Sequence, residues 1–206
     1  MIKEFIDIIL HIDKYLSIII SQYGFLTYFL LFFIIFIETG LVFTPFLPGD
    51  SLLFAAGTFA AIGSLNIILL LVIFCIAAVL GDTINYSIGK YFGKKLFSSN
   101  IINKKYYEET KDFYKKYGTK TIVIARFIPI VRTFAPFIAG IGNMNYVKFL
   151  SYNIIGGICW VSLFTLLGYF FGGIQFVKDN FSLVIIAIII LSFIPIIIEY
   201  IKHRRK

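Results

Sequence analysis

Two arginines within an apolar stretch constrain this chain more than any other feature. Arg126 and Arg132 lie in the almost wholly apolar residues 122–141, and Pro129 falls between them. A guanidinium at bilayer depth costs at least about 2.5–3.5 kcal/mol, so it is normally retained where it faces a partner, a wet cavity or a ligand. Pro129 and Pro136 each remove a backbone donor and oppose an uninterrupted helix. We therefore expect a broken, re-entrant segment that carries two cations into the membrane.

Composition and charge place the chain in a membrane. Hydrophobic residues make up 59% of it, charged residues make up 15%, and the mean hydropathy is +0.91, whereas soluble domains carry about 25% charged residues. The net charge of +8 predicts no nucleic-acid partner, because the basic residues gather beside apolar segments, in residues 90–120 and 202–206. Such segments are cytoplasmic by the positive-inside rule. We expect a multi-pass protein of the cytoplasmic membrane with a cytoplasmic, basic C-terminus.

Apolar segments of two kinds follow each other along the chain. A run of about 20 apolar residues can cross a hydrocarbon core about 30 Å thick, whereas a run broken by charges, glycine and proline is expected to be re-entrant. The expected order is an interfacial helix at 1–22, a re-entrant helical hairpin at 25–63, a span at 66–90, a cytoplasmic amphipathic helix at 94–120, a second re-entrant hairpin at 121–143, a span at 147–172 and a C-terminal span at 181–201. The predicted fold class is an all-α integral membrane protein with a single membrane domain, residues 1–206.

A shift of 79 residues indicates an internal repeat. It superimposes Gly63 on Gly142, Asn66 on Asn145, Gly89 on Gly168 and Gly93 on Gly172. Glycine positions report backbone geometry rather than apolar composition. Residues 1–93 then form the first repeat, and residues 121–173 form the core of the second. Because one span separates the two hairpins, they are expected to open to opposite faces, as in transporters built from inverted repeats whose broken helices meet near the midplane.

Two carboxylates in the first hairpin mirror the two arginines in the second. Opposite charges within about 4–6 Å favour each other's ionised forms, whereas burial favours a neutral carboxylate. We therefore expect Glu38 and Asp50 to pair with Arg126 and Arg132 in the empty site and to act as proton switches. A lipid phosphate would compete for the arginines, because their forked donors match phosphate oxygens. Protonation of the carboxylates would release the arginines and keep the site near neutral.

Six further residues are expected to support the site. They are Pro48, Gly49, Asp82, Tyr86, Pro129 and Asn143. Asp82 and Tyr86 lie one helical turn apart and share a face. Two roles remain open for Asp82, which are a structural anchor at the cytoplasmic boundary and a partner for a site arginine.

The sequence has no pattern typical of a hydrolase, a metal site or a disulfide framework. Cys75 and Cys159 each lie within a long apolar run, which is typical of free, buried cysteine. No histidine, metal-ligand cluster, or serine or cysteine beside a base lies near the arginines, so the usual nucleophile arrangements cannot be assembled. We expect no catalytic residue, no metal and no cofactor other than a proton gradient.

Several motifs in order resemble the DedA family, also known as the SNARE-associated or VTT-domain family. They are Glu38, Pro48-Gly49-Asp50, Gly81-Asp82 with Tyr86 and Gly89, Ala125-Arg126-Phe127-Ile128-Pro129 with Arg132, Ala139-Gly140 and Asn143-Met144. The resemblance covers about residues 20–175 and implies that Glu38, Asp50, Arg126 and Arg132 are the functional residues. Some members have Glu at the position of Asp50, which keeps the carboxylate.

This resemblance implies a lipid transporter of the bacterial cytoplasmic membrane that depends on the proton motive force. Bacterial members are associated with the return of undecaprenyl phosphate across the membrane or with phospholipid flipping, and eukaryotic relatives with lipid scrambling. The implied partners are a polyprenyl phosphate or a phospholipid, and protons. Glycine-lined helices also permit a homodimer.

Other functions remain open from the residues alone. A proton-coupled exchanger of small ions or osmolytes, which maintains membrane potential and pH, would use Glu38 and Asp50 without phosphate-binding arginines. A non-transporting assembly factor would tolerate conservative substitutions at all four charged positions. As a structural alternative, the four charges would only lock the hairpins together, and charge swaps would then restore the folding of single variants.

Overall fold

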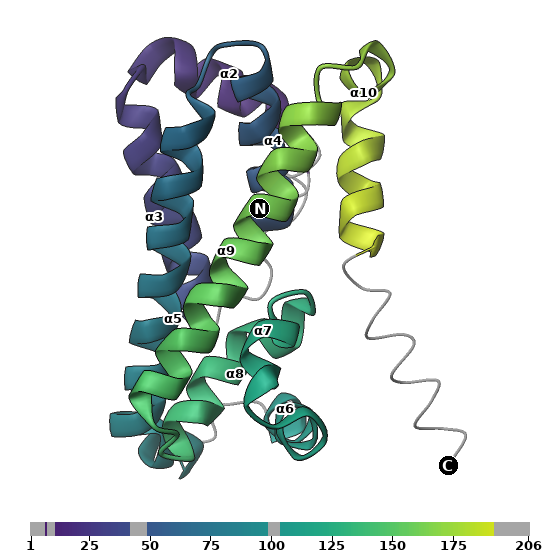
Figure 1. Cartoon of the computed structure of the whole chain (residues 1–206). Helices are drawn as coiled ribbons and strands as arrows, with labels where there is room; N and C mark the ends of the chain where they lie inside the picture. The colour runs from purple at the N-terminus through teal and green to yellow at the C-terminus, as the bar shows by residue number, and fades with distance from the viewer. Residues whose placement is uncertain (1–6, 8–10, 42–48, 99–103, 192–206) are drawn as a thin grey trace, which may run out of the picture. The chain divides into compact units, whose positions relative to one another are not determined.

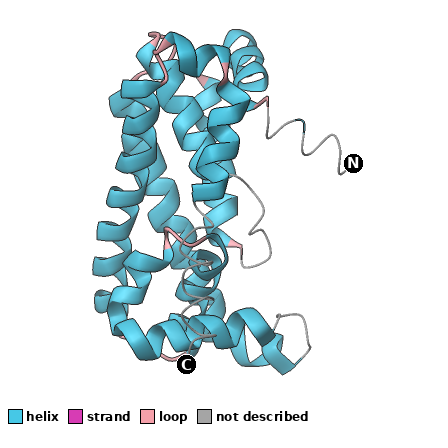
Figure 2. Ribbon diagram, turned by 90° about the vertical axis from the view of Figure 1, so that its right-hand side faces the viewer, coloured by secondary structure: helices cyan, strands magenta, loops and turns pink. Residues whose placement is uncertain are grey.

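The computed structural model describes residue 7 and residues 11–41, 49–98 and 104–191. Within these ranges almost every residue is helical and none lies in a β-strand (Figure 2). The helices in chain order are α2 (Ile12–Tyr23), α3 (Leu26–Gly40), α4 (Gly49–Ala61), α5 (Ile67–Ser98), α6 (Lys104–Tyr117), the 3-10 helix η1 (Gly118–Lys120), α7 (Thr121–Ala125), α8 (Pro129–Ile141), α9 (Tyr146–Phe171), α10 (Gln175–Asp179) and a last apolar helix, Phe181–Leu191. The predicted all-α class is confirmed for the described residues.

Two helices are long and apolar enough to cross a membrane. They are the Ile67–Gly93 part of α5, with 27 residues, and α9, with 26 residues. Both exceed the ~20 residues that a bilayer core requires. The helix that contains the expected span at 66–90 continues to Ser98, because no proline interrupts it. Of the expected C-terminal span, residues 192–201 lie outside the described residues.

Asparagine caps the start of both long helices. The Asn66 Oδ1 atom accepts hydrogen bonds from the backbone amides of Ile68 and Leu69, both at 3.0 Å. The Asn145 Oδ1 atom accepts one from the amide of Lys148 at 3.2 Å. Asparagine is a preferred N-cap because it satisfies amides that have no partner in the first turn. The two asparagines that the 79-residue shift superimposes therefore have the same capping role, each at the start of a long helix.

A break separates α7 from α8 within the expected re-entrant segment at 121–143. Ile128 is extended, with φ −126° and ψ 103°, and Pro129 is the first residue of α8. A residue before proline is driven from the helical region, and proline fits the first helical position, where no amide donor is needed. Contrary to expectation, α8 continues through Pro136. Next to this proline, the hydroxyl of Tyr114 on α6 donates to the Ala135 carbonyl at 2.8 Å.

The chain forms two compact units. The first unit consists of residues 1–33, 48–74 and 161–206, and the second unit of residues 34–47 and 75–160. The division falls within α3, α5 and α9, so each of these helices contributes to both units. Helix α2 contacts α4 in the first unit, and α6 contacts α7 and α8 in the second (Figure 1). Both arginines belong to the second unit, together with Glu38 and Asp82, whereas Asp50 belongs to the first.

A glycine pair lets α5 and α8 cross closely in the second unit. A Cβ atom on Gly89 would lie 2.1 Å from the carbonyl oxygen of Phe137, and one on Gly140 would lie 2.1 Å from that of Tyr86. Any larger residue would therefore push the two helices apart, as at other small-residue crossings in membranes.

The first unit contains the same kind of crossing, between α4 and α9. A Cβ atom on Gly57 would lie 2.1 Å from the carbonyl oxygen of Thr165, and one on Gly168 would lie 2.0 Å from that of Phe54. Glycine on both helices is again required for this approach.

Two different shifts relate these crossings. The glycines of the long helices, Gly89 and Gly168, are 79 residues apart, as the sequence repeat predicts, whereas those of the short helices, Gly57 and Gly140, are 83 apart. The difference arises in the connectors, because Gly57 precedes its N-cap asparagine by nine residues and Gly140 precedes its own by five. In each unit a long helix thus crosses a short one at a glycine pair, α9 with α4 in the first unit and α5 with α8 in the second.

Candidate functional site

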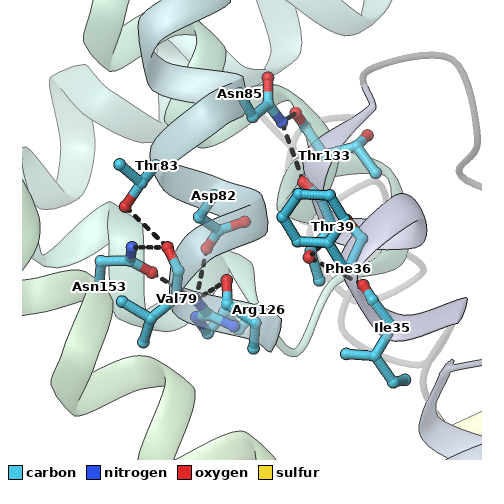
Figure 3. Close-up of polar contacts among 11 residues, drawn as sticks. Ile35, Phe36, Thr39, Val79, Asp82, Thr83, Asn85, Arg126, Thr133 and Asn153 are labelled. Carbon is cyan, nitrogen blue, oxygen red and sulfur yellow. Dashed lines mark hydrogen bonds and ion pairs between the residues drawn. The ribbon is translucent and has the colours of Figure 1, made fainter. Parts of the chain in front are cut away.

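Arg126 lies at the break between α7 and α8 and points its side chain towards α5 (Figure 3). Only 1% of the residue is exposed. Its Nη2 atom donates to Oδ2 of Asp82 at 2.5 Å and to the carbonyl oxygen of Ala78 at 3.4 Å. The same nitrogen also donates to Oδ1 of Asn153. One guanidinium nitrogen therefore joins the break to both long helices of the second unit.

The other donors of Arg126 are buried and have no partner among the described residues. In the part of the chain that the structure describes, neither Nε nor Nη1 has a hydrogen-bond partner, and the same holds for Oδ1 of Asp82. Burial of a polar group without a partner costs about 1–3 kcal/mol, and more for a charged one. A half-satisfied charged pair of this kind is expected where a ligand or water enters.

Helix α9 is shaped around Arg126. Asn153 donates through Nδ2 to the carbonyl oxygen of Val79 at 3.0 Å, which aims its amide oxygen at the arginine (Figure 3). A Cβ atom on Gly156 would lie 3.0 Å from Cδ of Arg126 and 3.2 Å from Nε. One on Gly157 would lie 3.6 Å from Nη2. The adjacent glycines thus allow α9 to approach the arginine closely.

Arg132 has different surroundings in the same unit. It forms an ion pair with Glu38 through Nη2 and Oε1, and the two side chains are 4% and 0% exposed. Its guanidinium carbon lies 4.9 Å from the ring centroid of Trp160, which is within the range of a cation–π interaction. A buried ion pair contributes little net stability, because desolvation offsets the attraction, but removal of one partner is costly.

Asn85 ties together the backbones beside this second pair. Its Nδ2 atom donates to the carbonyl oxygen of Thr133 at 2.8 Å and to that of Thr39 at 3.4 Å (Figure 3). Thr133 follows Arg132 in α8, and Thr39 follows Glu38 in α3. A single amide on α5 therefore fixes the chain next to both members of the ion pair.

The structure brings three of the four predicted charged residues into one unit. Glu38 contacts Arg132 as expected of a carboxylate partner, but the carboxylate that bonds Arg126 is Asp82. Of the two roles left open for Asp82, the geometry supports that of an arginine partner. Asp50 lies in the first unit, in the first turn of α4, and is 9% exposed.

Other residues expected to support the site have backbone roles. The Tyr86 hydroxyl donates to the carbonyl oxygen of Met144 at 2.5 Å. Asn143 has a left-handed backbone with φ 51°, a conformation that asparagine adopts more readily than most residues. Both residues fix the connector between α8 and α9. Gly49 begins α4, and Pro48 lies outside the described residues.

Sequence reasoning missed four residues on α9. They are Asn153, Gly156, Gly157 and Trp160. Their spacing of three, four and seven residues places them on one side of a helix. The signal that could have found them is an asparagine one turn before two adjacent glycines inside an apolar span, because polar and small residues there mark a helix contact.

Metal ligands do not gather in the described ranges. No group of three or more histidine, cysteine, aspartate or glutamate side chains there could hold a metal ion. Cys75 is half-buried, and Cys159 is exposed, contrary to the expectation of a buried thiol. A membrane span directs many apolar side chains outward to lipid, so an apolar run does not imply burial within the protein.

Comparisons with known proteins identify the family. The family model of the VTT domain matches residues 47–170. The chain is 53% identical over 210 residues to protein DedA of Escherichia coli K12, with 100% of this chain and 96% of that protein covered. It is 45% identical over 171 residues to an uncharacterized membrane protein of Mycobacterium tuberculosis, with 81% and 75% covered. It is 36% identical over 148 residues to the inner membrane protein YqjA of Escherichia coli K12, with 70% and 67% covered.

No solved structure matches this chain. The names of the relatives place them in membranes, in agreement with the two apolar helices of spanning length. This chain is therefore a membrane protein, and it belongs to the DedA family of VTT-domain proteins.

Proposed function

We propose that this protein is a proton-coupled transporter that moves a phosphate-bearing lipid across the bacterial cytoplasmic membrane. Arg126 and Arg132 bind the phosphate, and Glu38 and Asp50 exchange protons. The lipid is undecaprenyl phosphate or a phospholipid, and it is translocated without hydrolysis. The observation that carries this proposal is the burial of two arginines, each against a carboxylate, within one unit.

Buried ion pairs of this kind are costly if their only role is structural. Each buried ion loses several kcal/mol of hydration, and well-packed apolar residues often stabilise a protein as well or better. Ionisable residues retained at membrane depth therefore generally mark a transport pathway. The Nε and Nη1 atoms of Arg126, which have no hydrogen-bond partner among the described residues, supply donors that suit phosphate oxygens.

Proton coupling follows when a phosphate replaces a carboxylate as the partner of an arginine. An empty arginine–carboxylate pair is neutral, and an arriving phosphate adds negative charge to it. Uptake of a proton by the carboxylate removes that excess, because the neutral form is favoured in a buried site. Headgroup entry is thereby linked to proton entry, and headgroup release to proton release.

Glu38→Gln tests the proton switch. The amide keeps the shape of the side chain but has neither the charge nor the titrating proton. We expect lipid transport to be lost or to become independent of the pH gradient, measured as the transport rate with and without a gradient. Undiminished transport that still requires the gradient would remove Glu38 from the proton path, and Asp50→Asn serves as the parallel test.

The recurring glycine crossing supports an inverted-repeat architecture. A long helix crosses a short one at a glycine pair in each unit. In transporters built from inverted repeats, broken helices meet near the midplane and one repeat moves against the other. We infer the same design here, with re-entrant hairpins at 25–63 and 121–143 that open to opposite faces, a cytoplasmic C-terminus and helices that permit a homodimer.

Lipid movement in proteoliposomes tests the proposal as a whole. The purified protein is reconstituted with an imposed pH gradient, and transbilayer movement of undecaprenyl phosphate and phosphatidylethanolamine is followed. We expect the wild type to move one of these lipids and Arg126→Ala to move neither. The matched control is Lys178→Ala, which removes an exposed cation and is expected to leave transport unchanged.

A different result would favour the ion exchanger. If no lipid moves in sealed vesicles, but addition of Na⁺ or K⁺ drives proton flux, the carboxylates serve cation exchange and the lipid proposal is wrong. Equal loss of that proton flux in Glu38→Gln and Asp50→Asn would show that both carboxylates take part in the cation exchange.

A further inference from the structure

The contact between Asp82 and Arg126 uses only some of the hydrogen-bonding atoms of the two side chains. A carboxylate and a guanidinium can form two parallel hydrogen bonds, but here one oxygen of Asp82 bonds one nitrogen of Arg126. Among the described residues, the second oxygen and the two other guanidinium nitrogens have no hydrogen-bond partner. Asp82 is 2% exposed and Arg126 is 1% exposed, so water outside the protein does not satisfy these atoms.

We propose that Asp82 holds the place of the headgroup phosphate on Arg126. Asp82 neutralises the arginine while the site is empty and gives way when an oxyanion enters. This inference rests on the proposed function, in which Arg126 binds the phosphate, and it adds a residue whose task is to compete with the substrate.

Arg126 can keep its position when Asp82 leaves. Its Nη2 atom also donates to Asn153 and to the carbonyl oxygen of Ala78, and its side chain runs against Gly156. Asn153 is itself held by its bond to the backbone of α5. These contacts orient the guanidinium without the carboxylate, so an oxyanion meets an arginine that is already placed.

The charge of Asp82 is also accommodated when the contact breaks. The positive charge of Arg132 acts on Asp82. A monodentate contact has fewer hydrogen bonds to lose than a bidentate one. The displaced carboxylate therefore stays near a cation, which lowers the cost of the exchange.

A built-in competitor lowers the apparent affinity for the headgroup by the fraction of time in which Arg126 is available. Removal of the competing charge should therefore tighten binding. Because the competing contact is a hydrogen bond between charged groups, we expect its removal to change Kd by about tenfold or more. An anchor role predicts the opposite sign, since loss of an anchor disorders the arginine.

Binding of a short-chain phosphatidic acid to the full-length protein in detergent micelles tests this inference. The Kd is measured for the wild type, Asp82→Asn, and the double variant Asp82→Asn with Arg126→Ala. We expect Asp82→Asn to bind about tenfold more tightly than the wild type, and the double variant to lose that gain. The control is Asp179→Asn, which removes an exposed carboxylate and should leave the Kd unchanged.

Weaker or equal binding by a folded Asp82→Asn protein would overturn the place-holder role and leave the proposed function standing. If Asp82→Asn does not fold, Asp82→Ser carries the same prediction, because serine is neutral and still accepts a hydrogen bond. Equal binding of the matching diacylglycerol, which lacks the phosphate, by the wild type and every variant would overturn both the place-holder role and the proposed function.

Discussion

Arg126 and Arg132 are buried in the same unit, yet each is held differently. Arg126 is held at one nitrogen by Asp82 and an asparagine amide, and its side chain runs against two glycines of α9. Arg132 is bonded to Glu38, and the indole ring of Trp160 lies against its guanidinium. The two centres therefore share a carboxylate and differ in what else orients the cation.

This difference shows two ways to orient a guanidinium in an apolar interior. Hydrogen bonds at one nitrogen fix its direction, and at Arg126 they leave Nε and Nη1 unpartnered in the described residues. A ring contact fixes the plane of the cation without consuming an N–H donor. If both arginines bind one phosphate, Arg126 supplies N–H donors whose direction is fixed by hydrogen bonds. Arg132 supplies a guanidinium whose plane is fixed by the indole ring.

The largest effects are expected when one or both members of a charged pair are removed, because the single and double variants should differ in stability while neither transports lipid. Arg126→Leu leaves Asp82 buried without its counter-ion, so we expect a loss of about 3–5 kcal/mol in the free energy of unfolding and no transport. Arg126→Leu combined with Asp82→Leu should regain stability but not transport. Unfolding in detergent and lipid movement in vesicles are measured for the same preparations.

Recovery of transport in the apolar double variant would contradict this account, because it would reduce the pair to a structural lock. The same exchange at Arg132 and Glu38 sharpens the comparison. We expect it also to restore stability without transport, so a difference between the two centres would show that only one of them binds the substrate.

Gly156→Val should disturb the Arg126 centre and leave the Arg132 centre in place. Its Cβ atom would lie 3.0 Å from Cδ of Arg126 and 3.2 Å from Cα of Val123 in α7, so the arginine or the helix that precedes it must move. Overpacking costs about 1–3 kcal/mol, and displacement of a binding group by about 1 Å can lower a rate about 100-fold. The control is Gly173→Val, at a position where a Cβ atom meets nothing within 4 Å. Transport rates that match between the two variants would show that the glycine beside Arg126 is not needed.

Tyr114→Phe should have the smallest effect. It removes one hydrogen bond to the Ala135 carbonyl, worth about 1 kcal/mol of stability, and leaves both arginines in place. Burial, together with the negative charge of Asp82, raises the pKa of the Tyr114 hydroxyl. Its stabilising contribution is therefore complete below the unfolded pKa of about 10 and is lost as the pH rises above it.

Thermal unfolding between pH 7 and about pH 11 checks this sign. The wild type should lose stability at the alkaline end more steeply than Tyr114→Phe, and the two should converge there. A constant difference across the whole range would show that the hydroxyl does not titrate with unfolding.

Features set by local chemistry could be predicted from the sequence. Long apolar runs predicted α5 and α9, and the rarity of charge in apolar segments singled out both arginines. Pro129 predicted the break that precedes α8, because proline restricts the residue before it. The passage of α8 through Pro136 could not be predicted, because proline opposes the helix locally and tertiary context can override such a local preference.

Features set by tertiary packing were left open or missed. A partner role for Asp82 was one of two left open, because its pairing with Arg126 depends on the approach of α5 to the break before α8, which no local pattern encodes. The glycines beside Arg126 were missed, because their contact with the arginine arises only when α9 packs against the break before α8. The 83-residue relation between Gly57 and Gly140 became visible only through the carbonyl groups that they contact.

Emission from Trp160 offers the most direct test of phosphate binding at the buried arginines. It is the single tryptophan of the chain, and its ring lies 4.9 Å from the guanidinium carbon of Arg132. We predict a saturable change in emission when the detergent-solubilised protein is titrated with undecaprenyl phosphate, no such change with undecaprenol, and loss of the response in Arg132→Ala. An identical response to the uncharged alcohol, or constant emission at lipid concentrations that support transport, would contradict the account.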